Sequence, residues 1–297
     1  MITPPKLQIG DEVRIIAPAT SFSCVSAESQ KIIKSRFLAY GLKLSISEHA
    51  EEKDEFESSS IQNRVADLHS AFLDPQVKAI ICAKGGYNSN QLLPYLDYEL
   101  IKNHPKILMG FSDITALLNA ITAKTGIITY SGPTISRFGM PEYFEYTEEY
   151  WKKAVFSHDS YEIKASEYWD DDNWWEEKNR HRIKNEGYQV IQAGEAEGTI
   201  WGGNLCTFNL LQGTPYFPNL QDSILFIEDD DLAKEFSPQE FDRNLESLTQ
   251  VPEFSGVKGI AFGKFQQSTT MTFDKLQKIV KEKKALKNLP ILANVDF

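Results

Sequence analysis

The sequence has few cysteines and lacks the common motifs for metals and nucleotide cofactors. Three cysteines occur among 297 residues, Cys24, Cys82 and Cys206, and they show neither a paired spacing nor a zinc-binding pattern. Cys82 lies inside the apolar run VKAIICA, where a cysteine is usually a small buried hydrophobic residue. The chain has no G-x-G-x-x-G and no G-K-[ST] signature, which argues against a dinucleotide site and a P-loop. We therefore expect no disulfide, no metal and no cofactor.

Basic surfaces and long apolar runs are also missing. Lysine and arginine number 31 against 42 aspartate and glutamate residues, so the formal net charge is −11 and the sequence pI is about 5.1. Without a basic stripe, this charge argues against nucleic acid or an anionic membrane as a partner. No apolar run approaches the roughly 18 residues of a membrane span, and the N-terminus lacks the basic-then-apolar order of a signal peptide. We expect a cytoplasmic protein.

The first half of the chain alternates apolar strand-like runs with amphipathic helical segments. This alternation is typical of βαβ units and a mainly parallel sheet, whose functional loops lie beyond the carboxyl ends of the strands. The predicted strands are 11–17, 42–47, 77–83, 107–109 and 127–133, and the predicted helices are 26–40, 61–73, 113–125 and 139–156.

The second half begins with a change of composition. Residues 167–188 are rich in acid and tryptophan and contain no apolar run of strand length, which predicts a linker or loop. From Tyr188 the pattern changes to short strands and turns, followed by helices and strands near the C-terminus. The expected elements are an apolar strand ending at Glu228, a helix at 238–250, a strand pair at 256–265, a helix at 272–285 and a strand at 289–297.

Ser112 lies where the strand at 107–109 meets the helix that follows. A serine on such a turn can be a nucleophile, because the next backbone N–H is free to hold an oxyanion and the helix dipole favours negative charge. Serine is also a preferred N-cap residue, which is the simpler interpretation. The sequence Gly110-Phe111-Ser112-Asp113-Ile114 lacks the final glycine of the usual G-x-S-x-G elbow.

Two further stretches have both a structural and a functional interpretation. Gly85 and Gly86 follow the strand at 77–83 and can form an ordinary turn, or can supply a backbone oxyanion donor. The run Glu228-Asp229-Asp230-Asp231 can be a solvated turn, a site for a hard cation such as magnesium or calcium, or the source of one catalytic carboxylate.

The tryptophans of the 167–188 segment also have two interpretations. Trp169, Trp174 and Trp175 lie among charged residues, where three indoles within seven positions are hard to bury together. Packing is the commoner role of tryptophan, but stacking on a ligand is an equal alternative here, because aromatic residues concentrate at recognition surfaces.

Taken together, five stretches of the sequence resemble the serine peptidase family that contains murein LD-carboxypeptidases and the microcin C immunity proteins. The resemblance covers nearly the whole chain in the right order. It implies a cytosolic hydrolase, often a homodimer, with a mainly parallel, flavodoxin-like N-terminal α/β domain and a smaller β-rich C-terminal domain. We expect these domains at 1–160 and 188–297, with 161–187 as the loop between them. The five stretches are KGGYNSNQLLPYLDYELI (84–101), KILMGFSDITALLNAITAKTGIITYSGP (106–133), GTIWGGNL (198–205), ILFIED (224–229) and LANVDF (292–297).

The resemblance also implies roles for individual residues. The family nucleophile matches Ser112 in GFSDIT, and the acid of its Ser-Glu-His triad matches Glu228 in LFIED. The oxyanion donors would be the backbone N–H of Asp113 and one from the glycine loop, which we assign to Gly86, with Gly85 beside the substrate. Under this interpretation the acidic run at 228–231 supplies a triad member and not a metal site.

The triad histidine is where the sequence departs from the family. There it follows a strand like LANVDF in a Gly-His pair, and this sequence stops at Phe297 before such a pair. We favour a chain truncated at its C-terminus, with a non-catalytic relative as the alternative. As it stands, the chain is expected to be nearly inactive, because loss of a triad member removes on the order of 10⁴–10⁶ of the rate.

None of the histidines in the sequence stands in a matching context. His104 is close to Ser112 in sequence but precedes the strand at 107–109, so we expect it at the opposite end of the sheet. The histidines are His49, His69, His104, His158 and His181.

The loop and the tryptophans favour the microcin-immunity branch of the family. Murein carboxypeptidases typically carry Arg-Gly-Gly-Tyr-Gly, whereas this chain has KGGYNSN with Asn88, and it also has a Gly-Gly-Asn turn ending at Asn204. In the immunity branch, aromatic residues stack on a nucleobase, which would be the role of Trp169, Trp174 and Trp175. The resemblance thus implies cleavage of peptidyl or aminoacyl nucleotide analogues, with a murein tetrapeptide as the alternative substrate and ligand binding without turnover as a third possibility.

Overall fold

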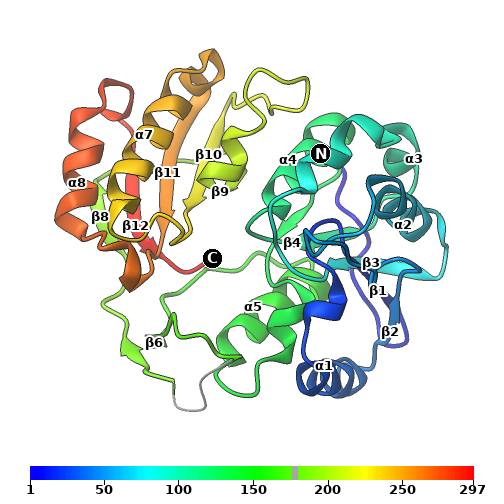
Figure 1. Ribbon diagram of the computed structural model, residues 1–297. Helices are drawn as coiled ribbons and strands as arrows, with labels where there is room; N and C mark the ends of the chain where they lie inside the picture. Colours follow the sequence, from blue (N-terminus) through cyan, green and yellow to red (C-terminus); the bar gives the residue numbers. More distant parts are fainter. Residues whose placement is uncertain (176–179) are drawn as a thin grey trace. The chain divides into compact units, whose positions relative to one another are not determined.

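The computed structural model describes residues 1–175 and 180–297, which form two compact units, Met1–Glu162 and Ile163–Phe297 (Figure 1). Each unit contains its own five-stranded sheet with helices packed against it. The expected α/β class is therefore confirmed. Among the described residues, no helix is both long and apolar enough to cross a membrane.

The sheet of the N-terminal unit is parallel throughout, with the strand order β2-β1-β3-β4-β5. This is the flavodoxin-like order, which confirms the expectation for this part of the chain. Helices α2, α3 and α4 pack together on one face, whereas α1 lies on the other (Figure 1). The strands are β1 (Glu12–Ile16), β2 (Lys43–Ile46), β3 (Val77–Cys82), β4 (Ile107–Gly110) and β5 (Tyr130–Ser131), and the helices are α1 (Ala27–Ala39), α2 (Ile61–Leu73), α3 (Tyr98–Asn103), α4 (Ile114–Thr125) and α5 (Glu145–Phe156).

Local sequence signals explain most of these elements. The unbroken apolar run of β3 is buried on both faces, as expected for a central strand of a parallel sheet. Helix α2 begins after Ser60, whose hydroxyl accepts a hydrogen bond from the Asn63 N–H. Helix α4 ends at Gly126, which adopts the left-handed conformation with φ of 76°.

Two predicted elements of this unit are shorter than expected. The strand predicted at 127–133 is reduced to the two residues of β5. The helix predicted at 139–156 begins only at Glu145, because Ile135–Gly139 forms a 3-10 helix and Met140 is extended. The extended backbone of Met140 follows from Pro141, since the residue before a proline is disfavoured in the helical region.

The sheet of the C-terminal unit has the order β8-β12-β11-β10-β9, with β8 antiparallel and the other four strands parallel. Helices α6, α7 and α8 pack in sequence order beside this sheet (Figure 1). The strands are β6 (Tyr168–Trp169), β7 (Ile183–Lys184), β8 (Gln189–Gln192), β9 (Thr199–Asn204), β10 (Ser223–Glu228), β11 (Val257–Gly263) and β12 (Ile291–Val295), and the helices are α6 (Leu205–Asn209), α7 (Ser237–Thr249) and α8 (Phe273–Glu282).

The strand pair predicted at 256–265 was wrong, because these residues form the single strand β11. Its glycines do not mark a turn. They allow close packing, since a Cβ on Gly259 would lie 3.0 Å from the Ala196 Cβ and one on Gly263 would lie 3.1 Å from the Glu228 Cβ.

The segment expected to be a linker, 161–187, belongs to the C-terminal unit from Ile163 onward. It contains β6 and β7, which pair antiparallel, whereas residues 176–179 lie outside the described part of the chain. The Asp296 carboxylate holds this segment, because it accepts hydrogen bonds from the Ser166 N–H at 2.8 Å and the Asn185 side chain at 3.1 Å. Lys264 forms an ion pair with the same carboxylate.

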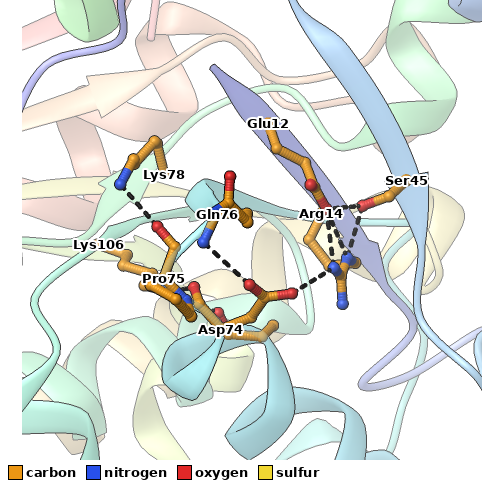
Figure 2. Close-up of polar contacts among 9 residues, drawn as sticks. Glu12, Arg14, Ser45, Asp74, Pro75, Gln76, Lys78 and Lys106 are labelled. Carbon is orange, nitrogen blue, oxygen red and sulfur yellow. Dashed lines mark hydrogen bonds and ion pairs between the residues drawn. The ribbon is translucent and has the colours of Figure 1, made fainter.

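At the amino ends of the strands of the first sheet, Lys106 joins the end of α2 to β4 (Figure 2). Its side chain is 8% exposed and donates to the carbonyl oxygens of Ala71, at 2.9 Å, and Asp74. The Asp74 carboxylate in turn accepts from the Gln76 N–H at 2.9 Å and from Arg14 Nη2 at 3.0 Å. Burial lowers the pKa of Lys106 to about 8. This network lies at the end of the β-strands opposite to Ser112.

We predict that Lys106 makes stability depend on alkaline pH. The pKa of an unfolded lysine is about 10.4, so between pH 8 and that value the unfolded chain binds more protons and the contribution of Lys106 to stability rises with pH. The neutral amine keeps two N–H donors for the two carbonyl oxygens. Relative to Lys106→Met, the free energy of unfolding of the wild type should increase by about 2 kcal/mol between pH 7.5 and 10.

Urea denaturation of both proteins at the two pH values measures this difference. Other titrating groups are common to both proteins and cancel. A parallel pH dependence for the two proteins would contradict the role assigned to Lys106.

Candidate active site

Ser112 occupies a sharp turn between β4 and α4, as the sequence predicts. Its φ is 61°, in the left-handed region that non-glycine residues rarely adopt. Such strain is found mostly at functional sites, where the surrounding structure enforces it. The N-cap of α4 is Asp113, so the N-cap interpretation of Ser112 is not supported.

Gly110 explains how the elbow forms without the usual second glycine. A Cβ at Gly110 would lie 2.8 Å from Cγ2 of Ile114, closer than such atoms can approach. The bare Cα of Gly110 therefore lets the first turn of α4 pack directly against the end of β4. In this elbow, Ile114 fills the position of the missing glycine.

The glycine loop after β3 lies directly against Ser112. A Cβ on Gly85 would lie 3.1 Å from both Cβ and Oγ of Ser112, and one on Gly86 would lie 2.9 Å from Thr20 Oγ1 and 3.0 Å from the Ala19 Cβ. Any side chain at either position would displace the loop or the serine. The structure thus brings together residues from the loops after β1, β3 and β4.

Two backbone N–H groups beside Ser112 remain available. The Gly85 carbonyl accepts a hydrogen bond from the Thr20 N–H at 3.3 Å, and in a planar trans peptide the Gly86 N–H points in the opposite direction. Within the described part of the chain, neither the Gly86 N–H nor the Asp113 N–H donates a hydrogen bond. These are the two donors that the family resemblance assigns to an oxyanion.

The Asp113 side chain binds the far end of the glycine loop. Its Oδ2 accepts from the N–H groups of Asn88 at 3.1 Å and Ser89 at 2.9 Å, and Ser89 Oγ donates to the Asp113 carbonyl at 2.6 Å. Burial raises the pKa of Asp113, whereas these hydrogen bonds and the Arg64 charge act in the opposite direction. Asn88, expected to contact substrate, here accepts from Arg64 Nη1 at 3.1 Å through both its carbonyl and its Oδ1.

Sequence reasoning missed Arg64 and Ser89. Arg64 is 4% exposed although it carries a charge, and Ser89 is fully buried. A detectable signal was present for Arg64, since it lies between Ile61 and Leu68 on the apolar face predicted for α2. Ser89 has no such signal.

The histidines of the N-terminal unit have other contacts. His104 precedes β4 and its Nδ1 contacts the Leu100 carbonyl at 2.8 Å, which agrees with the expected position at the opposite end of the sheet from Ser112. His69 Nε2 accepts from the Asp97 N–H at 3.0 Å, and His49 Nδ1 lies 3.1 Å from Glu52 Oε1.

In the C-terminal unit, Glu228 and Asn204 end the neighbouring strands β10 and β9 in direct register. The Asn204 side chain hydrogen-bonds the Glu228 carboxyl group, and its Oδ1 also accepts from the Thr207 N–H at 3.0 Å. The Gly-Gly-Asn stretch is therefore the end of a strand and not the expected turn. Position 202 still requires glycine, because a Cβ on Gly202, whose φ is 124°, would lie 2.2 Å from the Phe226 carbonyl oxygen.

The acidic run after β10 has strongly perturbed carboxyl groups. Burial, followed by repulsion from Asp229 and Asp230, raises the pKa of Glu228 to about 8. Burial and the charge of Asp230 raise the pKa of Asp229 to about 7. In the described residues, no group of three or more His, Cys, Asp or Glu side chains is arranged to hold a metal ion. A positive charge beside such a carboxyl group would favour its ionised form and lower its pKa.

The three tryptophans differ in their surroundings. Trp169 is half-buried in β6, where it pairs with Ile183 of β7. Trp174 and Trp175 form an edge-to-face pair with ring centroids 5.7 Å apart, and Trp175 is 59% exposed. An exposed indole held by another indole presents an apolar face for stacking.

The fold and the site describe an α/β protein with a flavodoxin-like sheet and a serine on a strand–helix elbow. Models of the LD-carboxypeptidase N-terminal domain match residues 13–132, and those of the C-terminal domain match residues 197–297. The protein named "Putative carboxypeptidase YocD" from Bacillus subtilis (strain 168) is 52% identical over 292 residues, 98% of this chain and 89% of that protein. The chain belongs to the LD-carboxypeptidase family.

Solved structures agree with this assignment. The crystal structure of an MccF-like protein from Bacillus anthracis str. Ames has a TM-score of 0.99 at 50% identity and covers 100% of this chain and 91% of that chain. The microcin C7 self-immunity protein MccF in complex with aspartyl sulfamoyl adenosine has a TM-score of 0.88 at 28% identity, covering 100% of this chain and 90% of that chain.

The strained backbone of Ser112 leads to a prediction for stability. Glycine adopts positive φ without a steric cost, whereas alanine keeps the strain, so Ser112→Gly should be more stable than Ser112→Ala by about 1 kcal/mol. Urea denaturation measures the difference. At Ser131, an exposed position in β5, the same pair of substitutions should have the reverse order, because glycine weakens a strand. The same order at both positions would contradict the strain assigned to Ser112.

The raised pKa of Glu228 leads to a second prediction. Between the unfolded value, about 4.3, and about 8, the native state binds more protons, so the contribution of Glu228 to stability falls as pH rises through this window. Glutamine removes this loss. Between pH 5 and 8.5, the free energy of unfolding of Glu228→Gln should rise relative to that of the wild type by about 2 kcal/mol. This figure is smaller than the full pKa shift implies, because Glu228 is partly exposed and its titration is coupled to that of Asp229. Thermal or urea denaturation at both pH values tests it, with the exposed Glu253→Gln as a control that should follow the wild type.

Proposed function

We propose that the protein is a serine hydrolase of the microcin-immunity type, which cleaves the amide bond of peptidyl or aminoacyl nucleotide analogues with Ser112 as nucleophile. One observation supports this proposal above the others. The Ser112 hydroxyl is carried on a left-handed elbow, against the bare Gly85 backbone, and the N–H groups of Gly86 and Asp113 donate to no partner that the structure describes.

In the proposed reaction, the histidine base that the resemblance implies takes the hydroxyl proton as Ser112 Oγ attacks the carbonyl carbon of the scissile amide. The C–N bond then breaks, the amine leaves with that proton, and water hydrolyses the Ser112 ester to free the acid and the serine. The negative charge that develops on the carbonyl oxygen is received by the N–H groups of Gly86 and Asp113, which are held in place before the reaction begins. Glu228 orients and stabilises the protonated form of a histidine base, the triad member that the resemblance implies. A cation beside Glu228 would lower its raised pKa and keep the carboxylate ionised.

The substrate proposal rests on the stretches that favour the microcin-immunity branch and on the bound ligand of one relative. The MccF structure that resembles this chain contains aspartyl sulfamoyl adenosine, an aminoacyl nucleotide analogue. The exposed Trp175, paired with Trp174, offers an aromatic surface for a nucleobase. Asn88 and Asn204 remain proposed substrate contacts from the family resemblance, although Asn204 is 1% exposed and its side chain hydrogen-bonds Glu228. A cytoplasmic homodimer is part of the same proposal.

The alternative substrate is a murein tetrapeptide, from which the enzyme would remove the terminal D-residue. The family match favours this alternative, because both matching domain models are those of LD-carboxypeptidases. The chemistry at Ser112 would be the same for both substrates.

The test compares the wild type, expressed from its own gene, with Ser112→Ala. Hydrolysis of aspartyl sulfamoyl adenosine and of a murein tetrapeptide is followed in parallel by chromatography. For a protein that carries the triad histidine, we expect cleavage of the nucleotide analogue. Ser112→Ala should lose at least about 10⁴-fold of this turnover, whereas binding of the analogue, measured by calorimetry, is retained.

Each other outcome has a definite meaning. Cleavage of the tetrapeptide alone would replace the microcin-immunity proposal by the murein one. Full activity of Ser112→Ala would refute the assignment of the nucleophile. Binding of the analogue by the wild type without turnover of either compound would identify a non-catalytic relative.

A further inference from the structure

The glycine loop after β3 needs support from outside itself. Gly85 and Gly86 have no side chains with which to anchor the loop, and glycine has the largest conformational freedom of any residue. The loop nevertheless presents a backbone N–H at a defined place beside Ser112. Its position must therefore be set by its neighbours.

Asp113 provides the first support. Its Oδ2 binds the N–H groups of Asn88 and Ser89, and its carbonyl accepts from Ser89 Oγ, so three hydrogen bonds join this residue to the end of the loop. Asp113 also carries one of the two proposed oxyanion donors, and Gly86 carries the other only two residues before Asn88. These hydrogen bonds thus fix the two donors relative to each other.

The Asp113 carboxylate has no comparable role in its own helix. Asp113 is the N-cap of α4, but its side chain makes no capping hydrogen bond there. It is 4% exposed, and burial of a carboxylate is costly unless the group is hydrogen-bonded. The contacts of its Oδ2 with the glycine loop explain why a carboxylate is buried at this point.

Arg64 supports the loop from the other side. Its Nη1 donates to the Pro18 carbonyl at 2.9 Å and to the Asn88 carbonyl at 3.1 Å, so one buried guanidinium joins the loop after β1 to the loop after β3. Two residues beyond Pro18, the Thr20 N–H holds the Gly85 carbonyl and thereby sets the direction of the Gly86 N–H. The carbonyl side of the Gly85–Gly86 peptide is therefore held by the loop that Arg64 binds through Pro18.

We propose that the Asp113 side chain and Arg64 are positioning residues, which hold the glycine loop so that the N–H groups of Gly86 and Asp113 converge on one oxygen atom. This inference rests on the proposed function for its catalytic meaning. Neither side chain contacts substrate in the proposal. Asp113 thus has two separate roles, one for its backbone N–H and one for its carboxylate.

The main experiment compares Asp113→Ala with Asp113→Asn. Because Oδ2 accepts both N–H groups, the single side-chain oxygen of asparagine can keep both hydrogen bonds, whereas alanine loses them. Amide hydrogen exchange, measured by mass spectrometry, should be at least about tenfold faster over 84–90 in Asp113→Ala, and close to the wild type in Asp113→Asn. Exchange over the strand 77–82 should not change in either variant.

Kinetics on aspartyl sulfamoyl adenosine give the second readout. Loss of a positioned oxyanion donor lowers kcat by about 10²-fold, so Asp113→Ala should show a loss of that order with KM within about threefold of the wild type. Asp113→Asn should restore kcat to within about tenfold of the wild type. A merely structural role would not separate kcat from KM in this way.

Arg64→Lys tests the second support without opening a large cavity. A lysine ammonium cannot bridge the carbonyl oxygens of both loops with the geometry of a guanidinium, so exchange over 84–90 should again increase. Gln91→Ala is the matched control, because the exposed Gln91 side chain accepts from Arg64 Nη2, at 2.9 Å, and not from the Nη1 that bridges the two loops. Exchange over 84–90 and kcat in this variant should equal those of the wild type.

The outcomes separate this inference from the proposed function. Unchanged exchange over 84–90 in Asp113→Ala, or in Arg64→Lys should the alanine variant not fold, would overturn the inference. Equal loss of kcat in Asp113→Ala and Asp113→Asn would also overturn it. If the wild type cleaves neither the nucleotide analogue nor the tetrapeptide, the proposed function fails, and the exchange data still decide whether these residues hold the loop.

Discussion

The left-handed backbone of Ser112 is the constraint on which the N-terminal unit depends. A strained conformation of this kind costs about 1–3 kcal/mol and persists only where the flanking elements are fixed. Here β4 is buried along its length, and α4 is anchored by the fully buried side chains of Ile114, Leu117 and Ile121. The bare Cα of Gly110 lets these two elements approach closely enough to force the turn.

A buried cation binds backbone carbonyl oxygens at each end of the parallel strands. At the carboxyl ends of the strands, near Ser112, Arg64 donates to carbonyl oxygens of two loops. At the amino ends, Lys106 donates to carbonyl oxygens at the end of α2. A buried cation is tolerated when backbone acceptors surround it. The two networks have different roles. The Arg64 network supports the loop that carries the Gly86 N–H, whereas the Lys106 network joins a helix end to a strand (Figure 2).

In the C-terminal unit, parallel strands place a carboxyl group where its charge is disfavoured. Glu228 lies between Asn204 on β9 and the bare Gly263 on β11, and Asp229 follows it directly. Among the described residues, the uncharged Asn204 side chain is the hydrogen-bond partner that offsets the burial and the like charges. Such a carboxyl group responds strongly to the approach of a cation, which is what the acid of a triad requires.

The sequence alone determined those features that depend on residues close together in the chain. Apolar periodicity predicted the parallel α/β unit, and the strand–turn–helix pattern predicted the elbow at Ser112, because both signals lie within a few residues. The assignments of Glu228 and Asn204 came from resemblance to a family, not from local pattern.

Only the tertiary structure decided which distant groups meet. The positive φ of Ser112, the hydrogen bonds of Asp113 to Asn88 and Ser89, and the bridge made by Arg64 all join loops that follow different strands. The single strand β11 was missed for the same reason, since its glycines serve contacts with neighbouring segments and not a turn. Pairing between residues far apart in the chain leaves no local pattern, and in this protein that pairing holds the backbone around the serine.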